Sequence, residues 1–543
     1  MSKKKSSSRR APARTEPAHS FLYAPGQLEP PQALFEMNDL HARVNKYLKD
    51  PLNARQTTAF VYSFDNRLTL LWGPPGTGKT TVAASIILGW LEHAWSLDMP
   101  LCIGVGSSNY NAIDNVLTDV ADLLDRRRAT LGTYPETHLL RVRSSYRMPP
   151  QDTRLTDIER NSEEARTLAE QLNSPSACFI VGGTWMQLGK MAQAVRETPA
   201  AHWFDLLVID EASQVSVASA GPYYLLLKPW AHVVLAGDHR QLGPIYGFQM
   251  RDTNKGLFDC IFTYMQETHR VEPVALEQNY RSNDEITGWS RIRFYGPGYQ
   301  AFRPKRRLDI SISDYGDQSP EGWPAQLPWS PEYPRLLNPN WPVAVVTYPP
   351  DMYTLSNPFE AQTVSSLAFL YRKILEENGK NPNDEEFWTK LLGIVTPHRA
   401  QMSAIKNLLV SAAGMPLDPP PFVDTVDRFQ GQERDLMIAS YAVADRDFVT
   451  SEEEFILNPR RFNVTLTRSK SKIMWFISDA IVQHLPSDRD VATDAAHLQL
   501  FVENYCNSLT ERITLPFIDD GKVRHMPCKL RVKMSAEDYG SKS

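Results

Sequence analysis

The chain has 543 residues, more than one hydrophobic core usually supports, so two or more domains are expected. Hydrophobic residues make up 42% and charged residues 22%, as in ordinary globular proteins, and no apolar stretch is long enough to cross a membrane. Five widely spaced cysteines without a C-x-x-C pair argue against a zinc module or a disulfide scaffold. We therefore expect no zinc, no membrane partner and a reducing intracellular compartment, either cytoplasm or nucleus.

The first 35 residues contain Ser, Arg and Pro with few large apolar side chains, so a disordered arm is expected at 1–35. Residues 1–15 carry six basic residues and no acid, although the whole chain has a net charge of −5. Such an arm is a solubilising tail, a nuclear signal or a non-specific phosphate-binding segment, and we favour the first interpretation slightly.

A first series of alternating strands and helices is expected over residues 36–267. An amphipathic helical stretch at about 36–60 precedes a strand at Leu68–Trp72 and a helix from Lys79 to about Trp95. Further apolar runs of strand length follow at Leu101–Gly106, Ala177–Val181, Leu206–Ile209 and His232–Ala236. Continuous apolar runs are typical of buried parallel strands. The charged residues at about 115–175 are expected to form an inserted helical subdomain.

A second series is expected over residues 268–505, with strands at Val343–Thr347, Leu391–Val395, Phe422–Val426, Leu436–Ser440 and Lys472–Ile477. Helices are expected at Pro358–Asn378 and His398–Ala413. The Pro- and Trp-rich residues at about 297–342 indicate an irregular insertion, and 506–543 a C-terminal extension. Alternating elements predict an α/β fold with parallel sheets and right-handed crossovers.

Residues Gly73–Thr80 match the P-loop pattern G-x-x-x-x-G-K-[ST] between a predicted strand and a predicted helix, which is the context the motif requires. The glycines let backbone N–H groups face the β-phosphate, Lys79 supplies charge to the β- and γ-phosphates, and the Thr80 hydroxyl binds Mg²⁺. A Gly-Pro-rich turn without a ligand would not need this context. ATP and Mg²⁺ are therefore the expected cofactors, with contacts from Gly73, Gly76, Gly78, Lys79, Thr80 and Thr81.

An acidic pair, Asp210 and Glu211, follows the strand at Leu206–Ile209. The carboxyl ends of parallel strands are where doubly wound sheets bind ligands. Asp210 is the candidate Mg²⁺ ligand, and Glu211 is the candidate base that polarises the attacking water. A simple strand-to-helix cap is the alternative, and the position of the pair after the P-loop argues against it.

Four further motifs narrow the class, and they follow in order as Gly237–Pro244, Gln278–Arg281, Val426–Glu433 and Arg460–Arg468. The set resembles motifs III to VI of superfamily 1 helicases, especially the Upf-like group that contains the nonsense-mediated-decay helicase, senataxin and the nidovirus helicases. The resemblance covers about residues 52–480 and implies two RecA-like domains that hydrolyse ATP in the cleft between them.

The resemblance also implies roles for individual side chains. Six would serve the nucleotide: Gln56 at the adenine edge, Tyr280 stacked on adenine, Gln241 sensing the γ-phosphate, Glu433 facing the nucleotide, and Arg281 and Arg468 as arginine fingers. Six residues would face nucleic acid at strand ends, where hydroxyl and backbone groups suit phosphate contacts: Ser108, Asn109, Thr184, Thr396, Pro397 and Thr425. A helix N-cap is an equally good explanation for any single Ser or Thr among them. The segment around Ser108 also lacks the proline of the family and is about one residue longer.

Three functions are compatible with these motifs. The leading one is a monomeric translocating helicase with the 5′→3′ polarity that the resemblance implies, on single-stranded RNA or DNA, with regulatory proteins supplied separately. A nucleic-acid-stimulated clamp or remodelling ATPase would use the same residues. A clamp-loader-type ATPase takes its arginine finger from a neighbouring subunit, and it is disfavoured because both candidate fingers lie in this chain. Phosphate contacts alone do not distinguish RNA from DNA.

Overall fold

The computed structural model describes residues 17–29, 37–194, 202–244, 255–414, 417–429 and 431–535. It divides into two compact units. The first unit comprises residues 1–73, 78–239 and 243–276, and the second comprises 74–77, 240–242 and 277–543. The boundary therefore follows Leu276, whereas the sequence placed it after residue 267. Strand β8 (Val274–Ala275) accounts for the difference, because it pairs with β1 in the first sheet.

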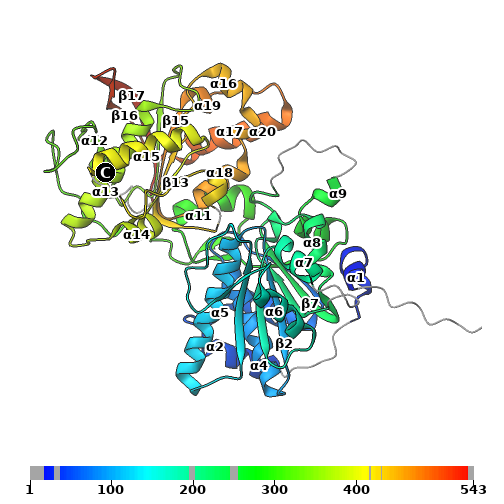
Figure 1. Ribbon diagram of the computed structural model, residues 1–543. Coiled ribbons are helices and arrows are strands. Elements are labelled where there is room, and N and C mark those ends of the chain that lie inside the picture. Colours follow the sequence, from blue (N-terminus) through cyan, green and yellow to red (C-terminus); the bar gives the residue numbers. More distant parts are fainter. Residues whose placement is uncertain are drawn as a thin grey trace, which may run out of the picture. The chain divides into compact units, whose positions relative to one another are not determined.

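The first unit is built on a parallel sheet with helices around it (Figure 1). The eight strands of this sheet follow the order β4-β3-β5-β2-β6-β7-β1-β8. In chain order its first seven strands are β1 (Leu68–Trp72), β2 (Leu101–Gly106), β3 (Thr137–Arg143), β4 (Thr156–Glu159), β5 (Cys178–Gly182), β6 (Phe204–Ile209) and β7 (Leu227–Gly237). Every residue of β2, β5 and β6 is buried. This burial on both faces explains why these strands read as unbroken apolar runs.

Helices cover both faces of the first sheet. Alternate strand residues such as Ile103 and Val105 pack with α2 (Met37–Asn45), α3 (Ala54–Asp65), α4 (Lys79–Ser96) and α5 (Tyr110–Leu131). The intervening residues, such as Cys102, pack in a second cluster with α1 (Pro17–Tyr23), α6 (Glu163–Asn173), α7 (Trp185–Ala194), α8 (Val217–Tyr224) and α10 (Ile261–Glu267). The period of two along each strand produces this separation.

The charged stretch at about 115–175 is not entirely helical. Helices α5 and α6 lie in it as expected, but β3 and β4 also lie in it and extend the main sheet at its β5 edge. Arg141 shows why the strand was missed. This side chain is buried in β3 and forms an ion pair with Asp114 at 2.6 Å, so its charge is compensated inside the fold.

The expectation of disorder over 1–35 does not hold for the described residues 17–29. Helix α1 forms there because Phe21, which is 0% exposed, packs against the ring of Tyr224 at 6.0 Å. The guanidinium of Arg67 lies 5.4 Å from the Phe21 ring centroid. The basic residues 1–15 lie outside the described residues.

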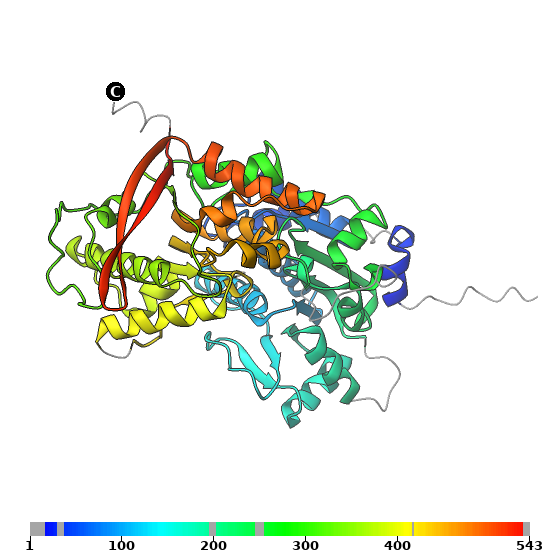
Figure 2. The same ribbon diagram turned by 90° about the horizontal axis from the view of Figure 1, so that it is seen from above.

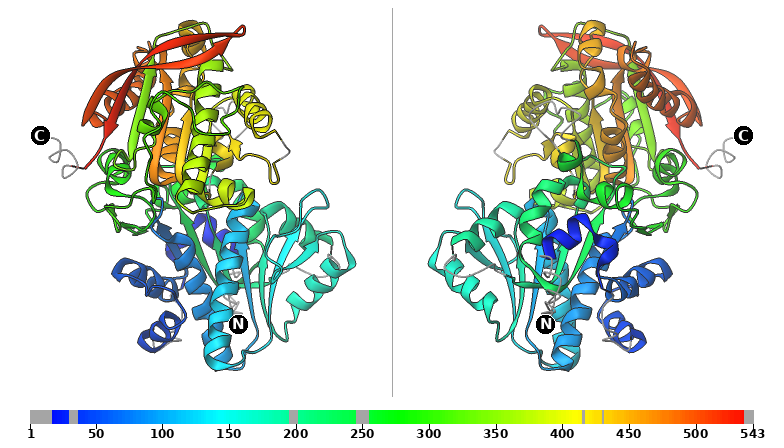
Figure 3. Two further views of the ribbon diagram at one scale, coloured as in Figure 1. Left: turned by 90° about the vertical axis from the view of Figure 1, so that its left-hand side faces the viewer. Right: turned by 90° about the vertical axis from the view of Figure 1, so that its right-hand side faces the viewer.

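The second unit contains a seven-stranded sheet in the order β13-β12-β14-β15-β11-β17-β16. Five strands are parallel: β11 (Val343–Tyr348), β12 (Leu392–Val395), β13 (Val423–Asp424), β14 (Arg434–Ser440) and β15 (Ser469–Ser478). The expected C-terminal extension instead supplies β16 (Leu509–Asp519) and β17 (Lys522–Lys533). They form a long antiparallel hairpin at the sheet edge, drawn in red in Figures 2 and 3. The second sheet is therefore mixed.

Two apolar clusters also enclose the second sheet. One contains residues of α12 (Glu332–Leu336), α13 (Pro358–Glu377), α15 (Arg399–Ala413) and the hairpin. The other contains residues of α11 (Asp284–Ser290), α18 (Pro459–Thr467) and α20 (Arg489–Leu500). The irregular residues 297–342 belong to this core, since Trp341 is buried in the first cluster and Trp323 and Trp329 pack against it.

Shorter elements complete the described chain. They are η1 (Pro25–Gln27), η2 (Ala212–Gln214), α9 (Lys255–Phe258), β9 (Gln278–Asn279), η4 (Arg291–Tyr295), β10 (Gln300–Ala301), α14 (Asp384–Glu386), η5 (Phe387–Leu391), η6 (Val426–Phe429), α16 (Arg446–Ser451), α17 (Glu453–Ile456), α19 (Asp479–Val482) and η7 (Phe501–Tyr505). Across the residues that the structure describes, no helix has the length and apolarity to span a bilayer.

A carboxylate, Glu360, is buried near the start of α13 in the second unit. The Tyr348 hydroxyl donates to one of its oxygens, and the Ser440 hydroxyl and the Ala442 backbone N–H donate to the other, at 2.5 and 2.9 Å. Burial nevertheless raises the pKa of Glu360 to about 7, because these hydrogen bonds offset only part of the lost hydration. This carboxyl therefore titrates near neutral pH.

Candidate nucleotide and nucleic-acid sites

The P-loop lysine lies at the first residue of α4, directly after β1 and its turn. Its Nζ donates to the Gly73 carbonyl at 2.5 Å, within the first unit. Gly78 has a positive φ of 82°, and a Cβ there would lie 2.7 Å from Nε2 of Gln56. Glycine is needed at this position for both conformation and space. The turn therefore presents backbone N–H groups next to a lysine at a helix start, which is an anion-binding arrangement.

The acidic pair lies at the carboxyl end of β6, in the same unit as Lys79. The Thr80 hydroxyl donates to Oδ2 of Asp210 at 3.4 Å. Burial raises the pKa of Asp210 and the Glu211 carboxylate raises it further, whereas Lys79 lowers it. A divalent cation would compensate this buried charge. A hydroxyl and a carboxylate supply the oxygen ligands that Mg²⁺ prefers, so the side chains fit the expected metal.

Glu211 has a left-handed backbone, with φ at 51°. Its N–H donates to Oδ1 of Asp210 at 2.9 Å, which holds the two acidic residues in a tight turn. Left-handed backbone is costly for a residue with a Cβ, and such conformations often mark functional sites. The side chain of Glu211 is half-buried, so one carboxylate oxygen can face a water molecule.

The two other candidates of the first unit differ in their surroundings. Gln56 is buried, and its Oε1 accepts from the N–H of Asn53 at 3.0 Å in a capping box at the start of α3. This bond fixes the amide orientation, with Nε2 toward Gly78. Thr81 is exposed on α4. Gln56 thus has a structural role in addition to the adenine contact that the resemblance implies.

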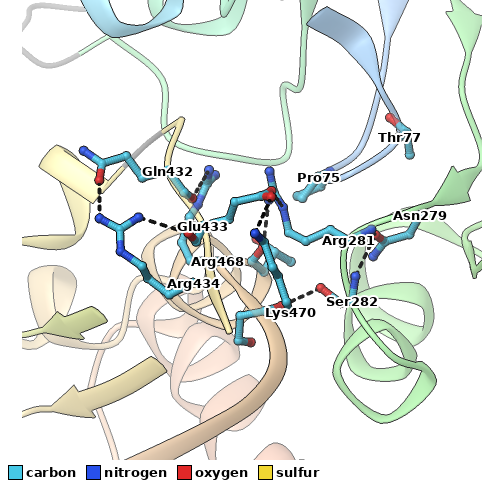
Figure 4. A network of polar contacts seen from close by, with 12 residues as sticks. Pro75, Thr77, Asn279, Arg281, Ser282, Gln432, Glu433, Arg434, Arg468 and Lys470 are labelled. Carbon is cyan, nitrogen blue, oxygen red and sulfur yellow. Dashed lines mark hydrogen bonds and ion pairs between the residues drawn. The ribbon is translucent and has the colours of Figure 1, made fainter. Parts of the chain in front are cut away.

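In the second unit, Arg281 and Lys470 both form ion pairs with Glu433 (Figure 4). Nε of Arg281 donates to one Glu433 oxygen, and Lys470 lies 3.0 Å from the other. Burial alone would raise the pKa of Glu433, but the two cations lower it to about 2. Arg281 also donates to the Thr467 carbonyl at 2.8 Å. These contacts hold the guanidinium of a predicted arginine finger beside the predicted nucleotide-facing carboxylate.

Arg468 is 2% exposed, and its Nη2 donates to Oε1 of Gln241 at 2.6 Å. Both residues belong to the second unit, because residues 240–242 cluster with it. Motif III and motif VI are therefore joined by a short charge-assisted hydrogen bond. The guanidinium orientation depends on Gln241, which the resemblance predicts to be the γ-phosphate sensor.

The tip of the P-loop, residues 74–77, also clusters with the second unit. The N–H of Tyr280 donates to the Gly76 carbonyl at 2.8 Å, and the Tyr280 ring lies 4.8 Å from that of Phe302. Gly76 has φ at 73°, and a Cβ there would lie 2.4 Å from the side chain of Asn279. The close approach explains why glycine is required in the middle of the motif.

The first group of predicted nucleic-acid residues lies at the carboxyl ends of β2 and β5. Ser108 is exposed, and its hydroxyl donates to Oε1 of Gln214 at 3.2 Å. Asn109 caps α5 by accepting from the Ala112 N–H at 2.9 Å, so the alternative helix-cap explanation applies to it. Thr184 lies two residues after the end of β5. The Thr184 carbonyl accepts from the N–H groups of Gln187 and Leu188, at 2.9 and 3.1 Å.

The second group lies at strand ends of the other sheet. Thr396 follows β12, and its buried hydroxyl has no hydrogen-bond partner among the described residues. Such a group is costly unless a ligand or water satisfies it. Pro397 follows it. Thr425 follows β13, and its carbonyl accepts from the N–H groups of Arg428 and Phe429.

Sequence reasoning missed three residues of these sites. Gln214 ends the Asp-Glu-Ala-Ser-Gln segment, and its Nε2 donates to Oε2 of Glu211 at 3.5 Å. Lys470 lies on β15, two residues after Arg468. Asn279 accepts from the N–H of Arg281 at 2.7 Å and donates to the Tyr299 hydroxyl at 2.8 Å. Gln214 and Asn279 lie inside recognised motifs, so the motifs held a signal that was not used.

Comparison with known proteins matches both units. One AAA domain family matches residues 56–248 and another matches residues 257–480. The DNA replication ATP-dependent helicase/nuclease DNA2 of Mus musculus is 26% identical over 442 residues, which cover 77% of this chain and 36% of the relative. The regulator of nonsense transcripts 1 homolog of Neurospora crassa is 25% identical over 451 residues, 77% of this chain and 36% of the relative.

Other similar proteins are also helicases. The DNA polymerase alpha-associated DNA helicase A of Saccharomyces cerevisiae is 22% identical over 476 residues, 79% of this chain and 65% of the relative. Among solved structures, an arterivirus nonstructural protein 10 helicase aligns with 78% of this chain and 61% of that chain, at 11% identity and a TM-score of 0.33.

The chain thus consists of a P-loop sheet and a second α/β unit with its own arginines, each matched by an AAA domain, as expected for two RecA-like domains. It is similar to proteins that are named helicases. A regulator of nonsense transcripts 1 homolog is among these relatives, which agrees with the similarity to the Upf-like helicases that the motifs predicted. The chain spans about a third of the length of the first relatives, at 36% and 35% for the mouse and human proteins.

Proposed function

We propose that this chain is an ATP-driven motor that moves along single-stranded nucleic acid in the 5′→3′ direction and separates strands. The observation that carries the proposal is the group at the end of β6. There an oxygen of Asp210 lies 3.4 Å from the Thr80 hydroxyl, and the charge of Lys79 offsets part of the rise in the pKa of Asp210. Lys79 would bind the phosphates, Thr80 and Asp210 would hold Mg²⁺, and Glu211 would accept the proton of the attacking water. When bound, Mg²⁺ would neutralise charge on the transferred phosphoryl group.

The nucleic acid would contact the strand ends beside this group. The sheet order places β6 next to β2, and β2 next to β5. The residues after β6 that would bind the nucleotide are therefore neighbours of Ser108 and Asn109, which follow β2. Thr184 follows β5, the next strand of the sheet. Thr396, Pro397 and Thr425 would supply equivalent contacts in the second unit. We further propose that the motor is monomeric, acts inside the cell, and takes regulators as separate proteins.

The names of similar proteins divide between DNA replication and nonsense transcripts, so the test compares both tracks. ATP turnover is measured with single-stranded RNA and single-stranded DNA of the same sequence. Unwinding is then measured on duplexes with either a 5′ or a 3′ overhang. We expect stimulation of turnover and unwinding from the 5′ overhang only.

Stimulated turnover without strand separation would replace the helicase by a clamp or remodelling ATPase, because that function uses the same catalytic residues. Turnover that ignores both tracks would contradict the proposal as a whole. The Glu211→Gln variant distinguishes turnover by this site from contamination, since a contaminating ATPase would be unaffected by the substitution.

A further inference from the structure

The loop between β3 and β4, residues 144–155 of the first unit, exposes two large side chains that are one residue apart in the sequence. Tyr146 is 95% exposed and Met148 is 81% exposed, with the exposed Arg147 between them. Among the described residues, Tyr146 has the highest exposed fraction of the exposed large hydrophobic side chains. An aromatic ring beside a guanidinium is the combination that binds unpaired bases and their phosphates.

The loop continues the row of predicted nucleic-acid contacts. In the sheet, β3 pairs with β5 in parallel, and β5 pairs with β2. The residues after β2, β5 and β3 therefore emerge at one edge of the sheet: Ser108 and Asn109, then Thr184, then the loop that carries Tyr146.

Side-chain contacts join these three segments. The hydroxyl of Tyr110, the residue after Asn109, donates to the Val142 carbonyl at 3.2 Å. Burial raises the pKa of Tyr110, and a side-chain hydrogen bond with Thr184 lowers it in part. The guanidinium of Arg147 lies 5.8 Å from the Tyr110 ring centroid. The loop therefore lies against Tyr110, which is adjacent to Asn109 in the chain and forms a hydrogen bond with Thr184.

Hydrogen bonds and ion pairs hold the loop at both ends, so Tyr146 is exposed on an ordered surface. The N–H of Arg147 donates to the Ser144 carbonyl at 3.0 Å, and Nη1 of Arg141 donates to the Met148 carbonyl at 3.0 Å. At the other end, Arg154 forms ion pairs with three carboxylates at 2.6–2.8 Å, those of Asp122, Asp125 and Asp152. An anchored loop loses little conformational entropy when a ligand binds.

We propose that the β3–β4 loop is a base-stacking platform, on which Tyr146 stacks against an unpaired base while Arg147 contacts the adjacent phosphate. This inference rests on the proposed function, and it extends the path of the nucleic acid past Thr184 to the loop after β3, the next strand of the sheet. The platform gives the motor a contact with the bases in addition to its contacts with the backbone. Stacking tolerates every base, because each has an aromatic face.

The test measures affinity by fluorescence anisotropy for an oligothymidylate and for an abasic strand of the same length. The native chain binds the oligothymidylate more tightly. Tyr146→Ala lowers that affinity by about five- to a hundredfold and abolishes the difference between the two strands. Tyr146→Phe retains the difference, since the ring remains. Arg147→Ala lowers the affinity for both oligonucleotides. It also reduces by about one the slope of log affinity against log salt concentration.

Tyr23→Ala is the matched control, because Tyr23 is a 54% exposed tyrosine on α1 of the same unit. It should leave both affinities unchanged, and thermal unfolding of each variant verifies the fold. The inference is overturned if Tyr146→Ala retains the native preference for bases. If the native chain binds neither strand, the proposed function itself fails. If it binds both strands equally, only the platform fails.

Discussion

Ser108 donates a hydrogen bond to the side-chain oxygen of Gln214 at 3.2 Å. The amide of the same Gln214 donates to Glu211 at 3.5 Å. One glutamine therefore contacts both a predicted nucleic-acid residue and the predicted catalytic base. A nucleic-acid strand that binds the Ser108 hydroxyl would change the hydrogen bonds of Gln214, and with them the contact between Gln214 and Glu211. In this way, binding of nucleic acid would affect ATP hydrolysis.

Replacing Gln214 by Ala should reduce the stimulation of ATP turnover by nucleic acid, because the side chain that joins the two segments is lost. The measurement is the ratio of turnover with and without single strands at saturating ATP. The control is Gln171→Ala, an exposed glutamine on α6. A ratio equal to that of the native chain would mean that the signal reaches Glu211 by another route.

Lys79→Ala should lower ATP turnover by at least about a hundredfold, since a charge aimed at the transition state is removed. Thermal unfolding should change little, because the ammonium donates its hydrogen bond to a carbonyl of its own P-loop turn, that of Gly73. Lys49→Ala, at an exposed lysine of the same unit, controls for loss of a positive charge. Near-native turnover in Lys79→Ala would refute the P-loop assignment.

Glu211→Gln should bind ATP normally but hydrolyse it slowly. The amide has nearly the same shape as the carboxylate, yet it does not accept the proton of the attacking water. Nucleotide affinity and single-turnover hydrolysis are measured separately, with the exposed Glu170→Gln as the control. If hydrolysis proceeds at the native rate, another residue is the base.

Arg468→Ala should lower the rate of ATP turnover by about a thousandfold or more, while ATP affinity falls far less. The guanidinium is buried and bonded to Gln241, so the variant should also unfold at a lower temperature. Arg468→Lys should not restore turnover, because an ammonium lacks the planar fork. Arg460→Ala, at an exposed residue at the start of α18, should behave like the native chain. Turnover within a few-fold of native in Arg468→Ala would exclude it as an arginine finger.

The stability of the chain should rise as pH falls from about 8 toward 5, through Glu360. Its folded pKa, about 7, lies above its ordinary value of 4.5, so the folded state binds the proton more tightly than the unfolded chain. The stabilisation is fully present below about 4.5 and is lost as pH rises through about 7. Thermal unfolding midpoints across this range measure it.

Glu360→Gln should remove this part of the pH dependence, because the amide does not titrate. Glu385→Gln, at an exposed glutamate of the same unit, should retain it. The same pH profile in Glu360→Gln as in the native chain would assign the dependence to another group.

The fully buried strands and the motifs at their ends could be predicted from the sequence, because burial on both faces leaves an unbroken apolar run. Strand β3 could not, since Arg141 and Arg143 lie in it with their charges compensated by Asp114 and Asp157. The role of Gln214 depends on a contact between residues that are far apart in the chain. Local patterns do not contain such contacts.

The hairpin at the end of the described chain has a consequence for solubility. Five residues of β11 pair with β17, so a chain ending ahead of Leu509 would leave the backbone of β11 without partners on that side. It would also uncover apolar side chains that the hairpin now buries, including those packed against Ile513 and Leu515. An unpaired, apolar strand edge is a template for association with other chains. Such a shortened protein should aggregate even though all of the predicted motifs are present.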